Sequence, residues 1–176
     1  AFARYGREIA QEWVTFGNWI HEGERQSIRS SILDYHRCQI VPIVNENDVV
    51  SDKEIRMMER GISENDRLAR MIAELIGADA ILFVTEKGGV YEEDPVRNAH
   101  ARLYADIDAE TARKIASISS STSLNGTGGM GAKLREAALC AQIGMRVAIA
   151  GIHRDTICKF AVGEPVGTII GTSVRF

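Results

Sequence analysis

Short apolar segments alternate with helical patterns along this chain, and this alternation restricts the possible folds more than any other feature of the sequence. The apolar runs Ile40–Val44, Ala80–Val84 and Arg146–Ala150 are largely continuous, which is typical of parallel strands covered on both faces. Each run follows a stretch in which apolar residues recur with helical spacing. The sequence therefore predicts an α/β fold in which helices sandwich a mainly parallel sheet, with ligands bound beyond the carboxyl ends of the strands.

The helical stretches each carry apolar residues on one face. Glu22 to Arg37 and Asp108 to Ser117 both have such a pattern, and Ser63 is a suitable N-cap for a helix that Gly77 would close. The core-facing stripe of that last helix comprises Leu68, Met71, Ile72, Leu75 and Ile76. A fourth helix has a face of small residues that could pack tightly on a sheet: Leu134, Ala137, Ala138, Ala141 and Gln142.

Size and charge exclude several classes of protein. With 176 residues, 45% of them hydrophobic and 26% charged, we expect one domain that spans residues 1–176. The net charge of −3 and the absence of a clustered basic run argue against nucleic acid as a partner. No segment approaches the run of about 18 apolar residues that a membrane span needs, and the N-terminus does not resemble a signal peptide. We therefore expect no membrane association and a cytoplasmic location.

The cysteines and histidines do not suggest a structural role. Cys38, Cys140 and Cys158 are odd in number and widely separated, which favours reduced, buried thiols over a disulfide framework. The four histidines show no close metal-ligand spacing, so we expect no structural metal.

A glycine-rich loop, Asn125 to Lys133, precedes the fourth helix and is typical of a phosphate site. Glycines let backbone N–H groups approach an anion, the N-terminus of the helix adds partial positive charge, and Lys133, expected in its first turn, adds a full charge. A dinucleotide-binding turn or a flexible connection would look similar. However, the polar stretch Ser117–Ser123, which we expect to be a loop, stands where a dinucleotide-binding turn needs a buried strand. Leu134 follows Lys133 where a P-loop has Ser or Thr, so a phosphate loop of another kind remains.

Three further polar clusters lie where the predicted elements begin or end. Asn45-Glu46-Asn47-Asp48 follows the first strand, Asn65-Asp66 opens a helix, and Thr85-Glu86-Lys87-Gly88-Gly89 follows the second strand. Each has an ordinary structural alternative, namely an Asx-rich turn, a helix cap and a charged turn. Their occurrence together at the ends of successive elements favours a ligand site.

The same residues carry a family resemblance. Val41 to Asp48, Asn65 to Ala69, Ile76 to Asp79, Thr85 to Pro95 and Gly126 to Lys133 occur in the order found in the amino-acid kinase superfamily, which has a carbamate kinase-like fold. The Asn-Glu-Asn-Asp and Gly-Thr-Gly-Gly-Met-x-x-Lys pieces most resemble the glutamate 5-kinase branch. This resemblance implies transfer of the γ-phosphoryl group of ATP, with Mg²⁺, to the side-chain carboxylate of L-glutamate, the first step of proline biosynthesis.

The resemblance also implies roles for individual residues. Asn45, Asp48 and Asn65 would hold glutamate, with Asp48 pairing with its α-ammonium group. Asp66 would organise the catalytic cations and Lys133 would contact the transferring phosphates. The expected lining of the ATP site is Thr85, Glu86, Thr127, Gly128, Gly129, Met130, Gly131, Ala132 and Lys133. A family member with another carboxylate, carbamate or phosphate acceptor, and a non-catalytic binding relative, are the alternatives.

Several features depart from the family pattern. Glu86 stands where the family usually has Asp, Ser63-Glu64 replaces a familiar Gly-Asp pair, and the connection Val49–Ile62 is longer than usual. No lysine precedes Lys53, so the phosphate-gripping turn that opens the family fold is not seen. We expect an N-terminally incomplete kinase domain with weak turnover, without a C-terminal RNA-binding-like domain, which forms a homo-oligomer, either a dimer or a tetramer.

Overall fold

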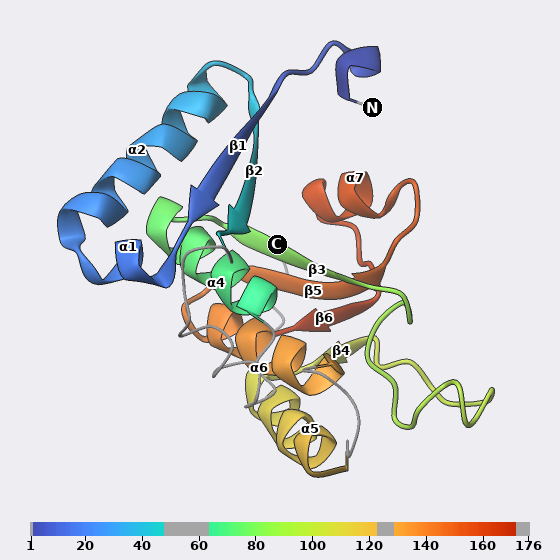
Figure 1. Cartoon of the computed structure of the whole chain (residues 1–176). Helices are drawn as coiled ribbons and strands as arrows, with labels where there is room; N and C mark the ends of the chain where they lie inside the picture. The colour runs from blue at the N-terminus through green and yellow to red at the C-terminus, as the bar shows by residue number, and fades with distance from the viewer. Residues whose placement is uncertain (1, 48–63, 123–128, 172–176) are drawn as a thin grey trace.

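A computed structural model describes residues 2–47, 64–122 and 129–171 (Figure 1). Helices and strands alternate along much of the chain, as the sequence predicts. The first part contains a 3₁₀ helix η1 (Phe2–Tyr5), β1 (Ile9–Val14), α1 (Phe16–Ile20), α2 (Glu22–Arg37) and β2 (Val41–Glu46). The second part contains α4 (Glu64–Ile76), β3 (Ala80–Thr85), β4 (Asp106–Ile107), α5 (Ala109–Thr122), α6 (Gly129–Gln142), β5 (Arg146–Gly151), α7 (Thr156–Ala161) and β6 (Thr168–Ile170).

The strands form two sheets in the described part of the chain. β1 and β2 pair in parallel, and a four-stranded sheet has the order β3-β5-β6-β4. Within the second sheet β3 is parallel to β5 and β4 is parallel to β6, whereas β5 and β6 are antiparallel. The expectation of a mainly parallel α/β arrangement is therefore confirmed.

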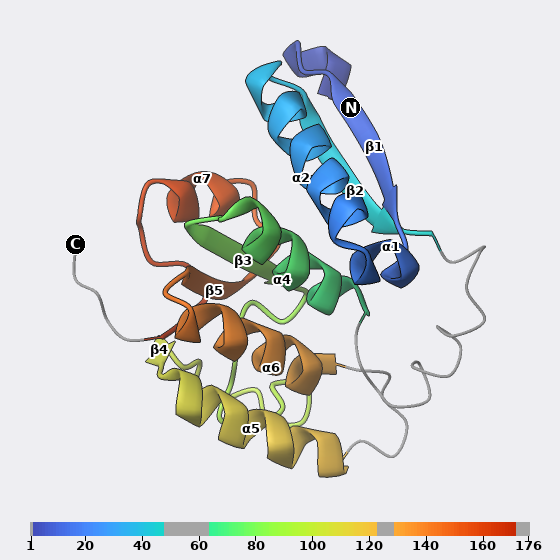
Figure 2. The same ribbon diagram turned by 90° about the vertical axis from the view of Figure 1, so that its left-hand side faces the viewer.

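Helices cover both faces of the four-stranded sheet. Figures 1 and 2 show α6 against one face, with α5 stacked outside α6, and α7 on the opposite face. α2 and α4 lie against the β1–β2 pair. The fold thus has the predicted sandwich of helices around a sheet.

α4 joins the two apolar clusters that make up the core. Leu68 packs with Val14, Ile28 and Ile32 next to the β1–β2 pair, whereas Ala73 belongs to the larger cluster around α6 and β5. The predicted stripe of α4 is confirmed, because its apolar residues are buried or packed on the first cluster. The helix ends at Ile76, and the φ of +71° at the following Gly77 suits glycine in the turn after a helix.

The prediction of buried strands is correct for β5, only partly correct for β3, and wrong for one face of β2, where Val41 and Ile43 are 36% and 37% exposed. In β5, every residue from Val147 to Gly151 is buried. β3 is an edge strand of its sheet, and Val84 is 40% exposed. A continuous apolar sequence does not distinguish an edge strand from a central one, since that depends on which strands pair.

Two expectations around the glycine loop are wrong in detail. The polar run from Ser117 does not begin a loop, because α5 continues through Thr122. α5 packs along α6, and such tertiary contact stabilises residues of modest helix propensity. A helix, not a strand, therefore precedes the glycines. α6 begins at Gly129, which places Lys133 at the start of the second turn and not in the first.

All three cysteines are free thiols, but only Cys140 is buried. The expectation of buried thiols is wrong for Cys38, at the C-cap of α2, and for Cys158, on the exposed side of the short helix α7. Burial raises the pKa of the Cys140 thiol to about 12.

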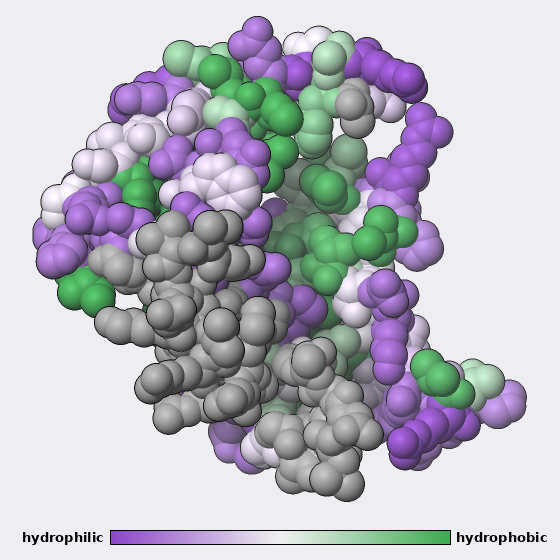
Figure 3. Space-filling view, in the orientation of Figure 1, coloured by the Kyte–Doolittle hydropathy of each residue, from purple (hydrophilic) through white to green (hydrophobic). Residues whose placement is uncertain are grey.

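The surface has a hydrophobic band. Figure 3 shows hydrophobic side chains along the β1–β2 pair and around α7. Ile9, Val41 and Ile43, which share one face of the β1–β2 pair, contribute to it, as does Ile157 of α7. Among the described residues, no helix is long and apolar enough to cross a lipid bilayer.

Candidate active site

Lys133 and Asp66 form an ion pair at the contact between α4 and α6. Lys133 Nζ lies 2.5 Å from Asp66 Oδ1, and the two side chains are 18% and 12% exposed. Asp66 is the third residue of α4, and Lys133 is the fifth residue of α6. Nζ also lies over the ring of Phe83 in β3, 5.7 Å from its centroid. Three elements therefore fix the position of the lysine.

This arrangement gives Lys133 a strong interaction with a negative group. The ammonium group has three N–H donors, and Asp66 accepts one of them. Because the pair is largely shielded from water, its charges interact more strongly than they would on an exposed surface. An anion that reached Nζ could accept a further hydrogen bond.

The first turn of α6 separates residues that are accessible from residues that are buried. Gly129 is exposed, and a Cβ there would meet no atom within 4 Å. Met130 packs against the larger core cluster, and Gly131 and Ala132 are buried. These three residues therefore face the protein interior. The groups of this turn that can bind a phosphate are its backbone N–H groups. Thr127 and Gly128 lie outside the described residues.

Thr85 ends β3, and Glu86 lies exposed in the turn that follows. Thr85 Oγ1 accepts a long hydrogen bond of 3.4 Å from the backbone N–H of Lys87. Lys87 Nζ donates to Asp94 Oδ1 at 2.9 Å, and this bond, together with the N–H of Val96, lowers the pKa of Asp94. The ion pair ties the turn to the segment that follows it.

Glycines allow the ends of β3 and β5 to meet. Gly88 has φ of +87°, which a tight turn here requires. A Cβ on Gly151, the last residue of β5, would lie 3.0 Å from Gly88 Cα. The two turns at the carboxyl ends of these parallel strands therefore touch, at the edge where α/β folds bind ligands.

The residues proposed to hold the acceptor are only partly described. β2 runs through Glu46, so Asn45 and Glu46 are strand residues and not part of a loop as expected. Glu46 is buried, whereas Asn45 is half-buried and stands opposite Trp13 of β1. Asn65 is exposed in the first turn of α4, next to Asp66. Asp48 lies outside the described residues.

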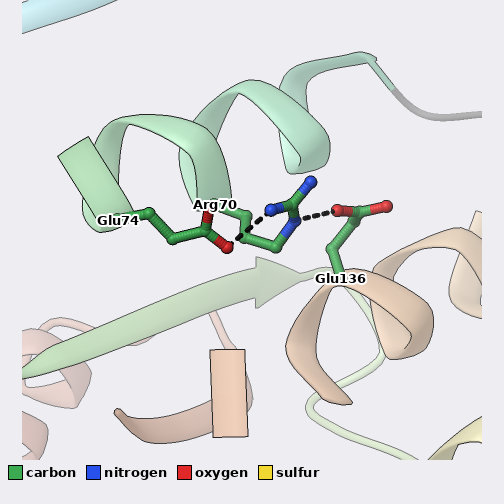
Figure 4. A network of polar contacts seen from close by, with 3 residues as sticks. All are labelled: Arg70, Glu74 and Glu136. Carbon is green, nitrogen blue, oxygen red and sulfur yellow. Dashed lines mark hydrogen bonds and ion pairs between the residues drawn. The ribbon is translucent and has the colours of Figure 1, made fainter. Parts of the chain in front are cut away.

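The structure adds two charged residues that the sequence analysis did not identify, Arg70 and Glu136 (Figure 4). Arg70 Nε donates to Glu136 Oε2 at 2.7 Å, and its Nη1 donates to Glu74 Oε1 at 2.5 Å. Burial alone would lower the pKa of the Arg70 guanidinium, but the hydrogen bonds to Glu136 and Glu74 outweigh it and raise that pKa. A signal was present in the sequence, since Glu136 interrupts the small-residue face of α6 three residues after Lys133.

The site combines helix N-termini, a shielded lysine paired with an aspartate and glycine turns at the ends of parallel strands, all within an α/β fold. These features are typical of α/β proteins that bind phosphate groups. The sequence profile of the amino acid kinase family matches residues 6–151, and the chain belongs to that family.

Two curated relatives are glutamate 5-kinases. The chain is 37% identical over 169 residues to the glutamate 5-kinase of Bordetella pertussis, covering 96% of this chain and 43% of the relative. It is 32% identical over 170 residues to the glutamate 5-kinase of Methanosarcina mazei, with coverage of 96% and 43%. The chain thus spans less than half the length of these relatives.

Solved structures support the fold. The isopentenyl phosphate kinase of T. acidophilum, in a product complex, superposes with a TM-score of 0.59 at 17% identity, covering 96% of this chain and 62% of that chain. The UMP kinase from Bacillus anthracis gives a TM-score of 0.59 at 14% identity, with coverage of 98% and 61%. At these identities the similarity concerns the fold alone.

Proposed function

We propose that the protein containing this chain transfers the γ-phosphoryl group of ATP to the side-chain carboxylate of L-glutamate, as a step in proline biosynthesis. A carboxylate oxygen would attack the γ-phosphorus, the bond to the β–γ bridging oxygen would break, and ADP would leave with glutamyl 5-phosphate as the product. The curated relatives named glutamate 5-kinase, at 32% to 37% identity, support this proposal.

The observation that carries the proposal is the Lys133–Asp66 ion pair between the early turns of α4 and α6. Phosphoryl transfer depends on positioning the two substrates and on neutralising charge that spreads over the transferring group. Lys133 would donate to the phosphate oxygens, and Asp66 would hold the ammonium group in place. The backbone N–H groups from Thr127 to Lys133 would hold further oxygens, with Thr85 and Glu86 beside the nucleotide.

We propose that Asn45, Asp48 and Asn65 hold the acceptor. An amide can bind the α-carboxylate of an amino acid, and a carboxylate can pair with its α-ammonium group. The exposed position of Asn65 next to Asp66 favours an acceptor that approaches from the N-terminal end of α4.

Mg²⁺ would neutralise phosphate charge during the transfer. In the described residues no cluster of three or more Asp, Glu, His or Cys side chains could hold a metal ion. We propose that Mg²⁺ enters bound to the nucleotide phosphates, as it commonly does in kinases.

Two further proposals concern the setting of the protein. The three free thiols are compatible with a reducing compartment such as the cytoplasm. Assembly into a dimer or tetramer would cover part of the exposed apolar face of the β1–β2 pair.

An acceptor panel tests the function. The gene product that contains this chain is incubated with ATP, Mg²⁺ and hydroxylamine, and with glutamate, aspartate, N-acetylglutamate or carbamate. An acyl phosphate is trapped as a hydroxamate, and ADP release reports transfer to any acceptor, including carbamate. Hydroxamate formation with glutamate alone would support the proposal. Preference for N-acetylglutamate or carbamate would assign another acceptor, and ATP binding without ADP release would indicate a non-catalytic relative.

A further inference from the structure

Two ion pairs connect α4 to α6, one helical turn apart. Asp66 of α4 pairs with Lys133 of α6, and Arg70 pairs with Glu136. Asp66 and Arg70 are four residues apart and Lys133 and Glu136 are three apart, so each helix presents its two charges on one face. From the first ion pair to the second, the residue numbers increase in both helices. Figures 1 and 2 show the two helices side by side.

The Arg70–Glu136 pair is well shielded and firmly anchored. The side chains of Arg70 and Glu136 are 18% and 6% exposed. Glu74, one turn further along α4, binds the same guanidinium (Figure 4), which restricts its rotamers. Replacing a shielded ion pair by apolar residues is often neutral or stabilising, so stability is a poor explanation for it. Fixing the register of two packed elements is the best-attested role of such pairs.

Many of the buried residues of α6 have small side chains. Gly131, Ala132, Ala137 and Ala138 are buried, together with the larger Leu134, Glu136 and Cys140. Small side chains form low ridges, which resist sliding of one helix along another less than large ones do. The alternating charges do resist it. A shift of one turn, about 5.4 Å, would bring Lys133 next to Arg70 or Glu136 next to Asp66, and both placements put like charges together.

We propose that Arg70 and Glu136 are positioning residues, which fix α6 against α4 so that Lys133 Nζ stays against Asp66. The positioning of Lys133 by this ion pair does not depend on the proposed function. Only its role in catalysis rests on that function, because in a kinase the register of the two helices would set the distance between the lysine and the transferring phosphate. Neither side chain is required to touch the substrate.

The accessibility of Lys133 to an amine-acetylating reagent measures its position without any substrate. Acetylation of each lysine in the 176-residue chain is followed by peptide mass spectrometry, with the exposed Lys114 and Lys159 as references within the same molecule. The test variant is Arg70→Met/Glu136→Met, which removes both charges and keeps unbranched side chains. The matched control is Asp34→Asn/Arg37→Gln, which neutralises an exposed ion pair on α2.

We expect the rate at Lys133 to rise at least threefold in the test variant and to stay unchanged in the control, while Lys114 and Lys159 react alike in all proteins. An unchanged rate in a test variant that circular dichroism shows to be folded would overturn the proposal, as would an equal rise in the control. If the double variant does not fold, Glu136→Gln is judged by the same two criteria. Protection of Lys133 by Mg²⁺ and ATP in the unmodified chain tests the proposed function separately, because the register result needs no nucleotide.

Discussion

Lys133 Nζ lies 2.5 Å from Asp66 Oδ1, although 67 residues separate the two in the sequence. The contact exists because α4 and α6 pack side by side, each beginning near a polar cluster that the sequence analysis had identified independently. The packing of the two helices thus combines two separate candidate sites into one.

Removing the charge of Lys133 should impair the chemical step more than substrate binding. In the gene product that contains this chain, we expect Lys133→Met to lower kcat by about two orders of magnitude or more, about 3 kcal/mol, since the lysine acts on charge that develops during transfer. The KM for glutamate should change much less. Steady-state kinetics measures both, and Lys159→Met, at an exposed position of α7, is the control. An unchanged kcat would mean that the glycine loop is a structural turn without a role in phosphoryl transfer.

Asp48→Asn should separate acceptor binding from nucleotide binding. Asp48 lies outside the described residues, and its role rests on the family resemblance. If its carboxylate pairs with the α-ammonium group, the substitution keeps the shape and should cost about 2 to 5 kcal/mol in glutamate affinity. Isothermal titration calorimetry should show nearly unchanged ATP affinity. Asp34→Asn, on the exposed face of α2, controls for the loss of one charge, and equal glutamate affinity in both variants would contradict the assignment.

The buried thiol of Cys140 should make stability fall at alkaline pH. Its pKa is raised by burial to about 12 from the ordinary 9.0, so between these values the unfolded chain loses a proton that the folded protein keeps. This group therefore contributes its stability below about pH 9 and loses it as the pH rises toward 12, with a slope of up to about 1.4 kcal/mol per pH unit. Urea unfolding between pH 8 and 11 should show a shallower decline for Cys140→Ala. Parallel curves would mean that the folded thiol ionises normally.

Gly167 should tolerate a side chain far less than another glycine of similar backbone conformation. A Cβ on Gly167 would overlap the carbonyl oxygen of Ile149 and lie 2.6 Å from Ala150 Cα, both in the central strand β5. Gly163 also has positive φ, +88° against +54°, but its Cβ would meet only Arg146 Nη1, at 3.6 Å. We expect Gly163→Ala to cost about 1 kcal/mol from backbone strain, and Gly167→Ala to cost several-fold more, because backbone must move. Thermal unfolding of the two variants compares them directly, and equal melting temperatures would refute the steric argument.

The helices and strands that could be predicted are those in which a single segment is long enough to show a recognisable hydrophobic pattern. α2 has the predicted bounds, Glu22–Arg37, and α4 shows its apolar stripe. β4 and β6 contain two and three residues, which is too short for any periodicity, and they exist because they pair with each other across about sixty intervening residues.

The residues of the candidate site were proposed one by one, but the contacts between them could not be predicted. Lys133 and Asp66 were each named from a local motif, whereas their contact depends on the packing of two helices. Arg70 has no local motif, and the interruption of the small-residue face of α6 by Glu136 can be interpreted only once α4 and α6 are seen to pack together. The start of α6 was misplaced because glycines suit both a loop and the opening turn of a helix.

One buried hydroxyl group, that of Thr168, holds together the two ends of the segment that follows β3. Thr168 Oγ1 accepts from the N–H of Val90 at 2.9 Å and donates to the carbonyl oxygen of Tyr104 at 2.7 Å, and the adjacent Tyr91 and Leu103 form an isolated bridge. Both ends of this segment, at Val90 and Tyr104, are thus fixed to the same residue of β6. Lengthening a loop with fixed ends costs only about 0.6 kcal/mol per doubling. The segment between Val90 and Tyr104 can therefore change in length and sequence during evolution at a small cost in stability, while the sheet keeps its structure.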